Sequence, residues 1–176
     1  MEIRTELTPL VRTDFGDDGA WCAVLRVVEA PVGGEGGVRA VVEVVDDPSF
    51  AAVSSERVVA SVGADVPHAV VVVADRRTMV DPAKPLLVVD RADGTGVRCV
   101  PEALWALLND TEFRGIGLAE MVEHVGADGL FRGVGGPQGL ERRLAAMAAL
   151  RRTGAAPATV RVPGRFPGAG GGSAAE

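Results

Sequence analysis

The sequence predicts an α/β fold, a single-domain sheet of about five strands with helices packed against it. Short runs rich in valine have the length and β-branched content of buried strands. Apolar stripes at helical spacing separate the first three of these runs, and an Asp93-Gly94 turn separates the last two. We therefore expect the first three strands to be parallel with helical crossovers, followed by a β-hairpin and C-terminal helices.

Residues 7–15 form the first predicted strand, and a helix should follow it. Asp17 and Asp18 stand where the N-cap and first turn of a helix favour acceptors. Apolar side chains then recur at i, i+3, i+4 and i+7, namely Trp21, Val24, Leu25 and Val28. Pro31 ends this pattern, so the helix should dock on the sheet through that stripe.

The next two strands are also separated by a helix. Glycine-rich residues 33–37 predict a flexible connection into a strand over 38–45, which residues 46–48 stop. A short serine-capped helix is expected over 54–62. The apolar run 68–74 has the character of a strand buried on both faces, so we place it centrally.

The second half of the chain begins with a predicted loop over residues 76–82. Residues 86–89 and 97–100 form the two strands of the expected hairpin. Beyond it, the sequence predicts a short helix over 101–108, a loop over 109–117 and a helix over 118–125.

Composition divides the chain of 176 residues into three parts. Residues 1–136 hold 12 basic and 22 acidic side chains and are predicted to be one acidic α/β domain. Residues 137–152 have the pattern of a basic amphipathic helix. Residues 153–176 are rich in Gly, Pro and Ala, which predicts a disordered tail.

The composition also excludes several classes of protein. The apolar fraction is 47% and the mean hydropathy is +0.21, yet no apolar run approaches the roughly 20 residues that span a bilayer. The N-terminus has no apolar core of signal-peptide length, so we expect a cytoplasmic protein. Cys22 and Cys99 are too few for a disulfide scaffold or a zinc site, and both are expected to be buried small hydrophobes.

The acidic charge of the predicted domain bears on its partners. Nucleic-acid phosphates would repel it, so no nucleic acid is expected to bind residues 1–136. A basic protein partner or a divalent cation fits the charge better, although the charge is also of a kind that serves solubility alone. The oligomeric state is not readable from the sequence.

Aspartates follow each of the first three predicted strands. Because parallel strands present their carboxyl ends at one edge, we expect these side chains to gather there. The predicted acidic edge consists of Asp14, Asp17, Asp18, Asp46, Asp47 and Asp75. Aspartate is also the preferred residue for turns and helix caps, so a purely structural role stays open.

A hard cation is the sharper interpretation of this edge. Mg²⁺ prefers oxygen ligands, and its set would be Asp14, Asp46 and Asp75. Arg76 and Arg77 are the candidate contacts for an anionic group such as a phosphate. No other cofactor is predicted.

Several short segments between Leu10 and Gly133 form a recognisable set. They are Val11–Phe15 with Asp17, Asp18 and Trp21; Val45–Pro48; Ala74–Arg76 with Thr78; Asp81-Pro82; Pro85–Asp90; and Asp128-Gly129 with Phe131–Gly133. Together these segments resemble a family of small actinobacterial proteins known only as a domain of unknown function. The resemblance implies one folded unit over this span. It implies no activity.

The lead hypothesis is a non-enzymatic protein-binding or immunity-like accessory domain that uses its acidic surface. It depends on the net charge and on the lack of catalytic motifs in the sequence. The alternative is a metal-assisted enzyme acting on phosphate-containing small molecules at the carboxyl edge of the sheet. A stable domain whose acidity serves only solubility is the third interpretation.

Overall fold

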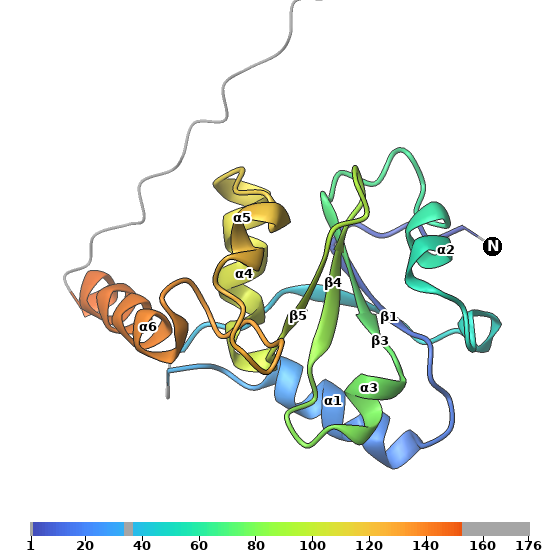
Figure 1. Ribbon diagram of the computed structural model, residues 1–176, viewed down its shortest axis with the longest axis horizontal. Helices are drawn as coiled ribbons and strands as arrows, with labels where there is room; N and C mark the ends of the chain where they lie inside the picture. Colours follow the sequence, from blue (N-terminus) through green and yellow to red (C-terminus); the bar gives the residue numbers. More distant parts are fainter. Residues whose placement is uncertain (1, 34–36, 153–176) are drawn as a thin grey trace, which may run out of the picture.

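A computed structural model describes residues 2–33 and 37–152 of the chain, so the predicted tail over 153–176 lies outside the described residues. Five strands form one sheet in the order β2-β1-β3-β4-β5 (Figure 1). They are β1 (Thr8–Arg12), β2 (Val42–Val45), β3 (Val70–Ala74), β4 (Leu86–Asp90) and β5 (Gly96–Cys99). The predicted α/β class with a single sheet is confirmed.

The pairing of the strands also follows the prediction. β1 is parallel to both β2 and β3, with Leu10 opposite Val44 on one side and opposite Val72 on the other. β3 pairs antiparallel with β4, which forms an antiparallel hairpin with β5. β3 is the central strand of the five, as its unbroken burial predicts.

Helices cover both faces of the sheet. They are α1 (Asp18–Glu29), a 3₁₀ turn η1 (Pro48–Phe50), α2 (Ser55–Ala60), α3 (Arg76–Val80), α4 (Pro101–Phe113), α5 (Leu118–Val122) and α6 (Gly136–Arg152). Side chains of α1, α4 and α5 pack in one apolar cluster and those of η1 and α2 in another. Figure 1 shows α2 on the side of the sheet away from α4 and α5.

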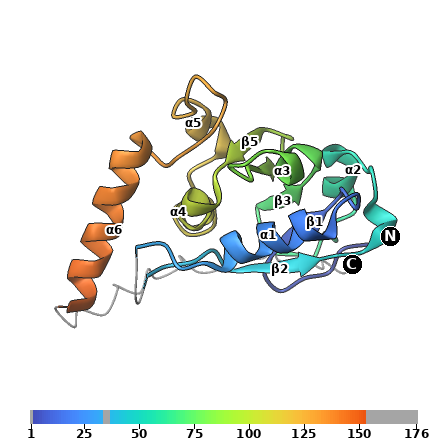
Figure 2. The ribbon, with the colours of Figure 1, turned by 90° about the horizontal axis from the view of Figure 1, so that it is seen from below.

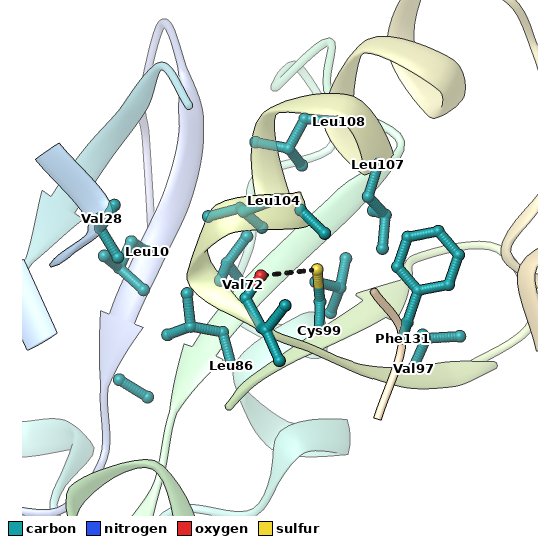
Figure 3. Packing of buried hydrophobic residues seen from close by; sticks show 14 of the residues in the cluster. Leu10, Val28, Val72, Leu86, Val97, Cys99, Leu104, Leu107, Leu108 and Phe131 are labelled. Atoms are coloured by element: carbon teal, nitrogen blue, oxygen red, sulfur yellow. Dashed lines mark hydrogen bonds between the residues drawn. The ribbon is translucent and has the colours of Figure 1, made fainter. Parts of the chain in front are cut away.

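The alternation of the central strands supplies both clusters. Val72 belongs to the cluster under α4, whereas its neighbours Val71 and Val73 belong to the cluster under α2. Figure 3 shows Leu104 and Leu107 of α4 directed toward the sheet, with Phe131 beside Cys99. Burial on both faces explains why the central strands β3 and β4 consist of nearly unbroken valine and leucine.

Three local predictions are wrong. Residues 76–82 were expected to be a loop, but Asp75 and Thr78 form a reciprocal capping box that starts α3. The loop expected over 109–117 begins later, because α4 continues to Phe113. Cys22 is exposed rather than buried, whereas Cys99 is buried as expected.

The basic last helix is fastened to the body of the domain. Arg143 of α6 donates two hydrogen bonds to the Asp110 carboxylate of α4, at 2.7 and 2.8 Å. The same guanidinium lies 5.1 Å from the ring centroid of Trp105, also in α4. Asp110 is buried, and Arg114 completes its ion pairing at 3.0 Å. A charge cluster therefore joins α6 to α4.

None of the helices in residues 2–33 and 37–152 has both the length and the apolar character needed to cross a membrane.

Candidate functional site

The predicted acidic edge exists at the carboxyl ends of β1, β2 and β3. Asp14 lies two residues after β1, Asp46 and Asp47 follow β2, and Asp75 follows β3. The Thr13 N–H donates to the Ala74 carbonyl at 2.9 Å, which holds the ends of β1 and β3 side by side. Asp17 and Asp18 begin the helix that leaves this edge.

Arg12, the last residue of β1, is the centre of the acidic edge. Its guanidinium donates to Asp18 Oδ1 at 2.6 Å and to Asp46 Oδ1 at 3.3 Å, and Nε donates to the Asp14 carbonyl at 2.9 Å. The charge also lies 4.4 Å from the ring centroid of Phe15 and 5.5 Å from that of Trp21. Three polar partners and two rings therefore fix this side chain.

The Arg12 charge is retained in spite of its burial. Only 4% of the side chain is exposed. Burial opposes the charged form, but the ion pairs with Asp18 and Asp46 outweigh it, so the pKa of Arg12 is raised. Asp46 is held further by the Trp21 indole, whose Nε1–H donates to Oδ2 at 2.9 Å.

Three of the predicted aspartates hold turns and helix starts. Asp14 accepts from the Gly16 N–H at 2.8 Å, and Asp17 caps α1 by accepting from the Ala20 N–H at 2.9 Å. Asp47 caps η1 through the Ser49 N–H at 2.9 Å, and this hydrogen bond lowers the pKa of Asp47. These contacts are the local roles for which aspartate is favoured at such positions.

Asp75 pairs with a different arginine from the one that binds Asp18 and Asp46. Arg98 of β5 binds the Asp75 carboxylate with both terminal nitrogens, one of them at 2.8 Å from Oδ1. Burial alone would raise the pKa of Asp75, but hydrogen bonds from Arg98 and Thr78 outweigh it and lower the pKa. The predicted edge is therefore divided between two arginines.

The lowered pKa of Asp75 predicts a specific acid sensitivity. The ion pair contributes stability above the unfolded pKa of about 3.9, and this stability is lost as pH falls through the lower folded value. Asp75→Asn should therefore be less stable than the wild type at neutral pH, and the gap should narrow below about pH 4. Urea unfolding of both proteins across that range measures it, and a gap that is constant with pH would rule out this linkage.

Arg76 and Arg77 are exposed residues of the first turn of α3, the helix that leaves β3. Arg77 Nε lies 3.9 Å from Asp81 Oδ2, one turn along the helix. The candidate anion contacts thus lie at the carboxyl edge, and one of them faces a carboxylate of its own helix.

The proposed magnesium ligands are engaged by other groups. Both oxygens of Asp46 and both oxygens of Asp75 accept hydrogen bonds from side chains. Within the described part of the chain, no three His, Cys, Asp or Glu side chains come together in a way that could hold a metal ion. The geometry lends no support to the Mg²⁺ set of Asp14, Asp46 and Asp75, which stays an untested prediction.

The two arginines at the centre of the site are missing from the predicted set of residues. Arg12 could have been identified from the sequence. It is an arginine within a strand expected to be buried, and aspartates follow the ends of that strand and of its neighbours. Arg98 lies 23 residues from Asp75, and no local pattern connects them.

No curated protein matches the chain. A family model described as a domain of unknown function (DUF6924) matches residues 7–134, a span that contains the whole sheet, both arginines and every aspartate of the acidic edge. The chain belongs to this family, DUF6924.

Proposed function

We propose that the domain binds a protein partner and that its acidic edge recognises a cationic segment of that partner. The observation that carries this proposal is the burial of the countercharge. Arg12 is 4% exposed while the Asp18 side chain that it binds is 88% exposed, so the surface of the cluster is negative and its positive charge lies beneath.

The capping contacts are compatible with such binding. A carboxylate has about four lone-pair sites, so a single backbone N–H leaves room for a guanidinium or ammonium donor. Asp17, Asp46 and Asp47 are exposed, as is Asp18. The hydrogen bonds that cap α1 and η1 also fix the carboxylates of Asp17 and Asp47 in place, which lowers the entropy that ordering them would cost on binding.

The partner that fits this edge is a segment rich in arginine or lysine. Five aspartates lie at the ends of β1 and β2, and two of them, Asp18 and Asp46, pair with the buried Arg12 guanidinium. Residues 1–136 carry 12 basic and 22 acidic side chains, a net charge of −10 that would steer the approach of a cation. The exposed Arg76 and Arg77 flank the edge on the side of β3. They would favour a segment lying over β1 and β2.

Binding of a labelled octa-arginine peptide, followed by fluorescence anisotropy, tests the proposal. We expect salt-dependent binding that the D17N/D18N/D47N variant weakens by about tenfold, since three exposed contacts at roughly 0.5 kcal/mol each amount to that factor. Asparagine still caps helices at positions 17 and 47, and Asp46 still pairs with Arg12, so the variant should fold.

The matched control neutralises three exposed carboxylates elsewhere, as E29Q/E120Q/E123Q. It changes the net charge by the same amount and should leave the affinity near that of the wild type. Equal losses in the two variants would show that overall charge, and not the acidic edge, attracts the peptide.

A further inference from the structure

A hollow lies at the amino ends of the parallel strands, at the opposite end of the sheet from the acidic edge. It is lined by Leu7 and Thr8 where β1 begins, by Ala40 ahead of β2 and by His68 ahead of β3. Residues of α4 and α6 complete it, and we call it the α4 hollow. Figure 2 shows α4 beside α6, with the segment that leads into β2 passing close to both.

The walls of the α4 hollow are held by contacts of their own. Residues 38–41 lie outside the sheet, and Val38 exchanges two hydrogen bonds with Val32, at 2.7 and 3.0 Å. Met147 of α6 forms another wall, and the ion pairs of Asp110 join that helix to α4. The shape of the hollow is therefore preformed, which is typical of small-molecule sites.

The lining of the α4 hollow is mostly apolar. Eight of its twelve residues are apolar, among them Trp105 and Leu108 of α4. Val41 is 60% exposed and Phe113 is 73% exposed, so part of this apolar lining is in contact with water. The volume of about 400 Å³ lies within the roughly 300–1,000 Å³ of small-molecule sites. An aliphatic chain that displaced water from the lining would be bound by the hydrophobic effect.

The histidine of the lining is engaged by its neighbours. His68 Nδ1 lies 3.5 Å from Thr8 Oγ1 and 3.6 Å from Glu112 Oε2. His68 Nε2 lies 2.8 Å from the Glu6 carbonyl oxygen, and Glu112 Oε1 accepts from the Ala69 N–H at 3.1 Å. Both ring nitrogens are thus occupied, so the imidazole is not the group that would hold a ligand.

Arg39 is the one lining residue with a permanent charge. It is exposed, and within the described residues its guanidinium has no hydrogen bond or ion pair. A guanidinium binds a carboxylate through two parallel N–H donors. Asn109 also lines the hollow and can donate through its side-chain amide. The α4 hollow therefore combines an apolar lining with donors for one anionic head group.

We propose that the α4 hollow binds a small amphipathic carboxylate, with its aliphatic chain against the apolar lining and its head group at Arg39. Residues 1–136 hold 12 basic and 22 acidic side chains, so the field of the domain as a whole repels anions. The affinity would come from burial of the chain and from one local ion pair. This site is separate from the acidic edge, so a failure of either proposal leaves the other intact.

Chemical-shift titration of the ¹⁵N-labelled full chain with octanoate tests this site. We expect saturable shifts, largest at residues 38–41 and at Trp105, Asn109 and Phe113, with a dissociation constant below about 1 mM. Octanol, which has the same number of carbon atoms but no charge, is the matched ligand. It should shift the same residues, because the lining that receives its chain is the same.

The charge of Arg39 can be tested by substitution. Arg39→Gln should weaken the binding of octanoate about fivefold, the factor that an exposed ion pair of about 1 kcal/mol supplies, and that of octanol less than about twofold. Arg26→Gln is the matched control, since it removes the same charge from an exposed residue of α1 outside the hollow. It should leave both affinities unchanged.

The apolar lining can be tested in the same way. Phe113→Ala should weaken both ligands about threefold or more, because it removes an exposed ring from the lining. Val122→Ala, at a residue of α5 that is 48% exposed and lies outside the hollow, should change neither affinity. Both residues are exposed, so neither variant should impair folding.

The absence of saturable shifts up to about 1 mM octanoate would overturn the proposal. Equal losses in Arg39→Gln and Arg26→Gln would show that net charge, and not the α4 hollow, attracts the carboxylate. Shifts confined to other parts of the chain would place the site elsewhere. A dimer in sedimentation equilibrium that Phe113→Ala dissociates, with no binding of octanoate, would assign the hollow to a second copy of the chain.

Discussion

Replacing Asp110 with Ala should lower the free energy of unfolding by about 3 kcal/mol and release α6 from α4. The carboxylate is buried, with 2% of its side chain exposed, and it accepts three hydrogen bonds from Arg143 and Arg114. Removing one member of a buried ion cluster costs about 3–5 kcal/mol, and the partial exposure of Arg143 places the cost at the low end. Urea unfolding measures the loss.

Arg114→Ala is the internal control for this result. Arg114 binds the same carboxylate but is 59% exposed, so its loss should cost under about 1 kcal/mol. Arg143→Ala should behave more like Asp110→Ala and should also change the Trp105 fluorescence, because the guanidinium lies over that ring. If Asp110→Ala left the unfolding free energy unchanged, the cluster would not be what fastens α6.

Replacing Arg12 with Ala should cost about 3 kcal/mol as well. The substitution removes a buried side chain that joins Asp18, Asp46 and the Asp14 carbonyl and that packs against Trp21. The carboxylates left behind can be hydrated, since the side chains of Asp18 and Asp46 are 88% and 42% exposed, which keeps the cost below that of a fully buried pair. Thermal and urea unfolding measure it.

Arg12→Lys separates charge from geometry. Lysine keeps the positive charge but cannot reproduce the planar fork that serves three acceptors, so it should recover only part of the lost stability. Full recovery by lysine would show that the charge alone matters. An unchanged stability of Arg12→Ala would contradict the view that this residue organises the acidic edge.

The sheet was predictable because its central strands, β3 and β4, are largely buried on both faces. Unbroken runs such as Val70–Ala74 have few other physical explanations, and their spacing by helical stripes dictated the parallel half of the topology. The hairpin followed from the turn signal at Asp93-Gly94. The residue types of short segments were therefore enough to predict which strands are buried and how they pair.

A local capping contact and pairings between distant residues account for what the sequence did not reveal. α3 has only five residues, too few for an apolar stripe, and it exists because of the Asp75 capping box. The pairing of Arg98 with Asp75 crosses from β5 to the end of β3. The pairing of Arg143 with Asp110 joins α6 to α4 through two residues that are 33 positions apart in the sequence. Neither leaves a periodic signal.

The aspartates of the acidic edge were predictable in position, although not in partners. A residue type that follows each parallel strand must gather at one edge, and it does so here. The same residues cap α1, η1 and α3, so the structural interpretation of the aspartates is correct for Asp17, Asp47 and Asp75. Capping and partner binding can coexist, because a cap fixes a carboxylate without neutralising it.

Chemical-shift mapping of the ¹⁵N-labelled full chain, titrated with the octa-arginine peptide, tests the proposed binding surface most directly. We expect the largest amide shifts at residues 14–18 and at Asp46, Asp47 and Ser49, which surround the acidic edge, and their loss in the D17N/D18N/D47N variant. Shifts spread over all acidic surfaces of the chain, or centred away from the ends of β1 and β2, would contradict the proposal.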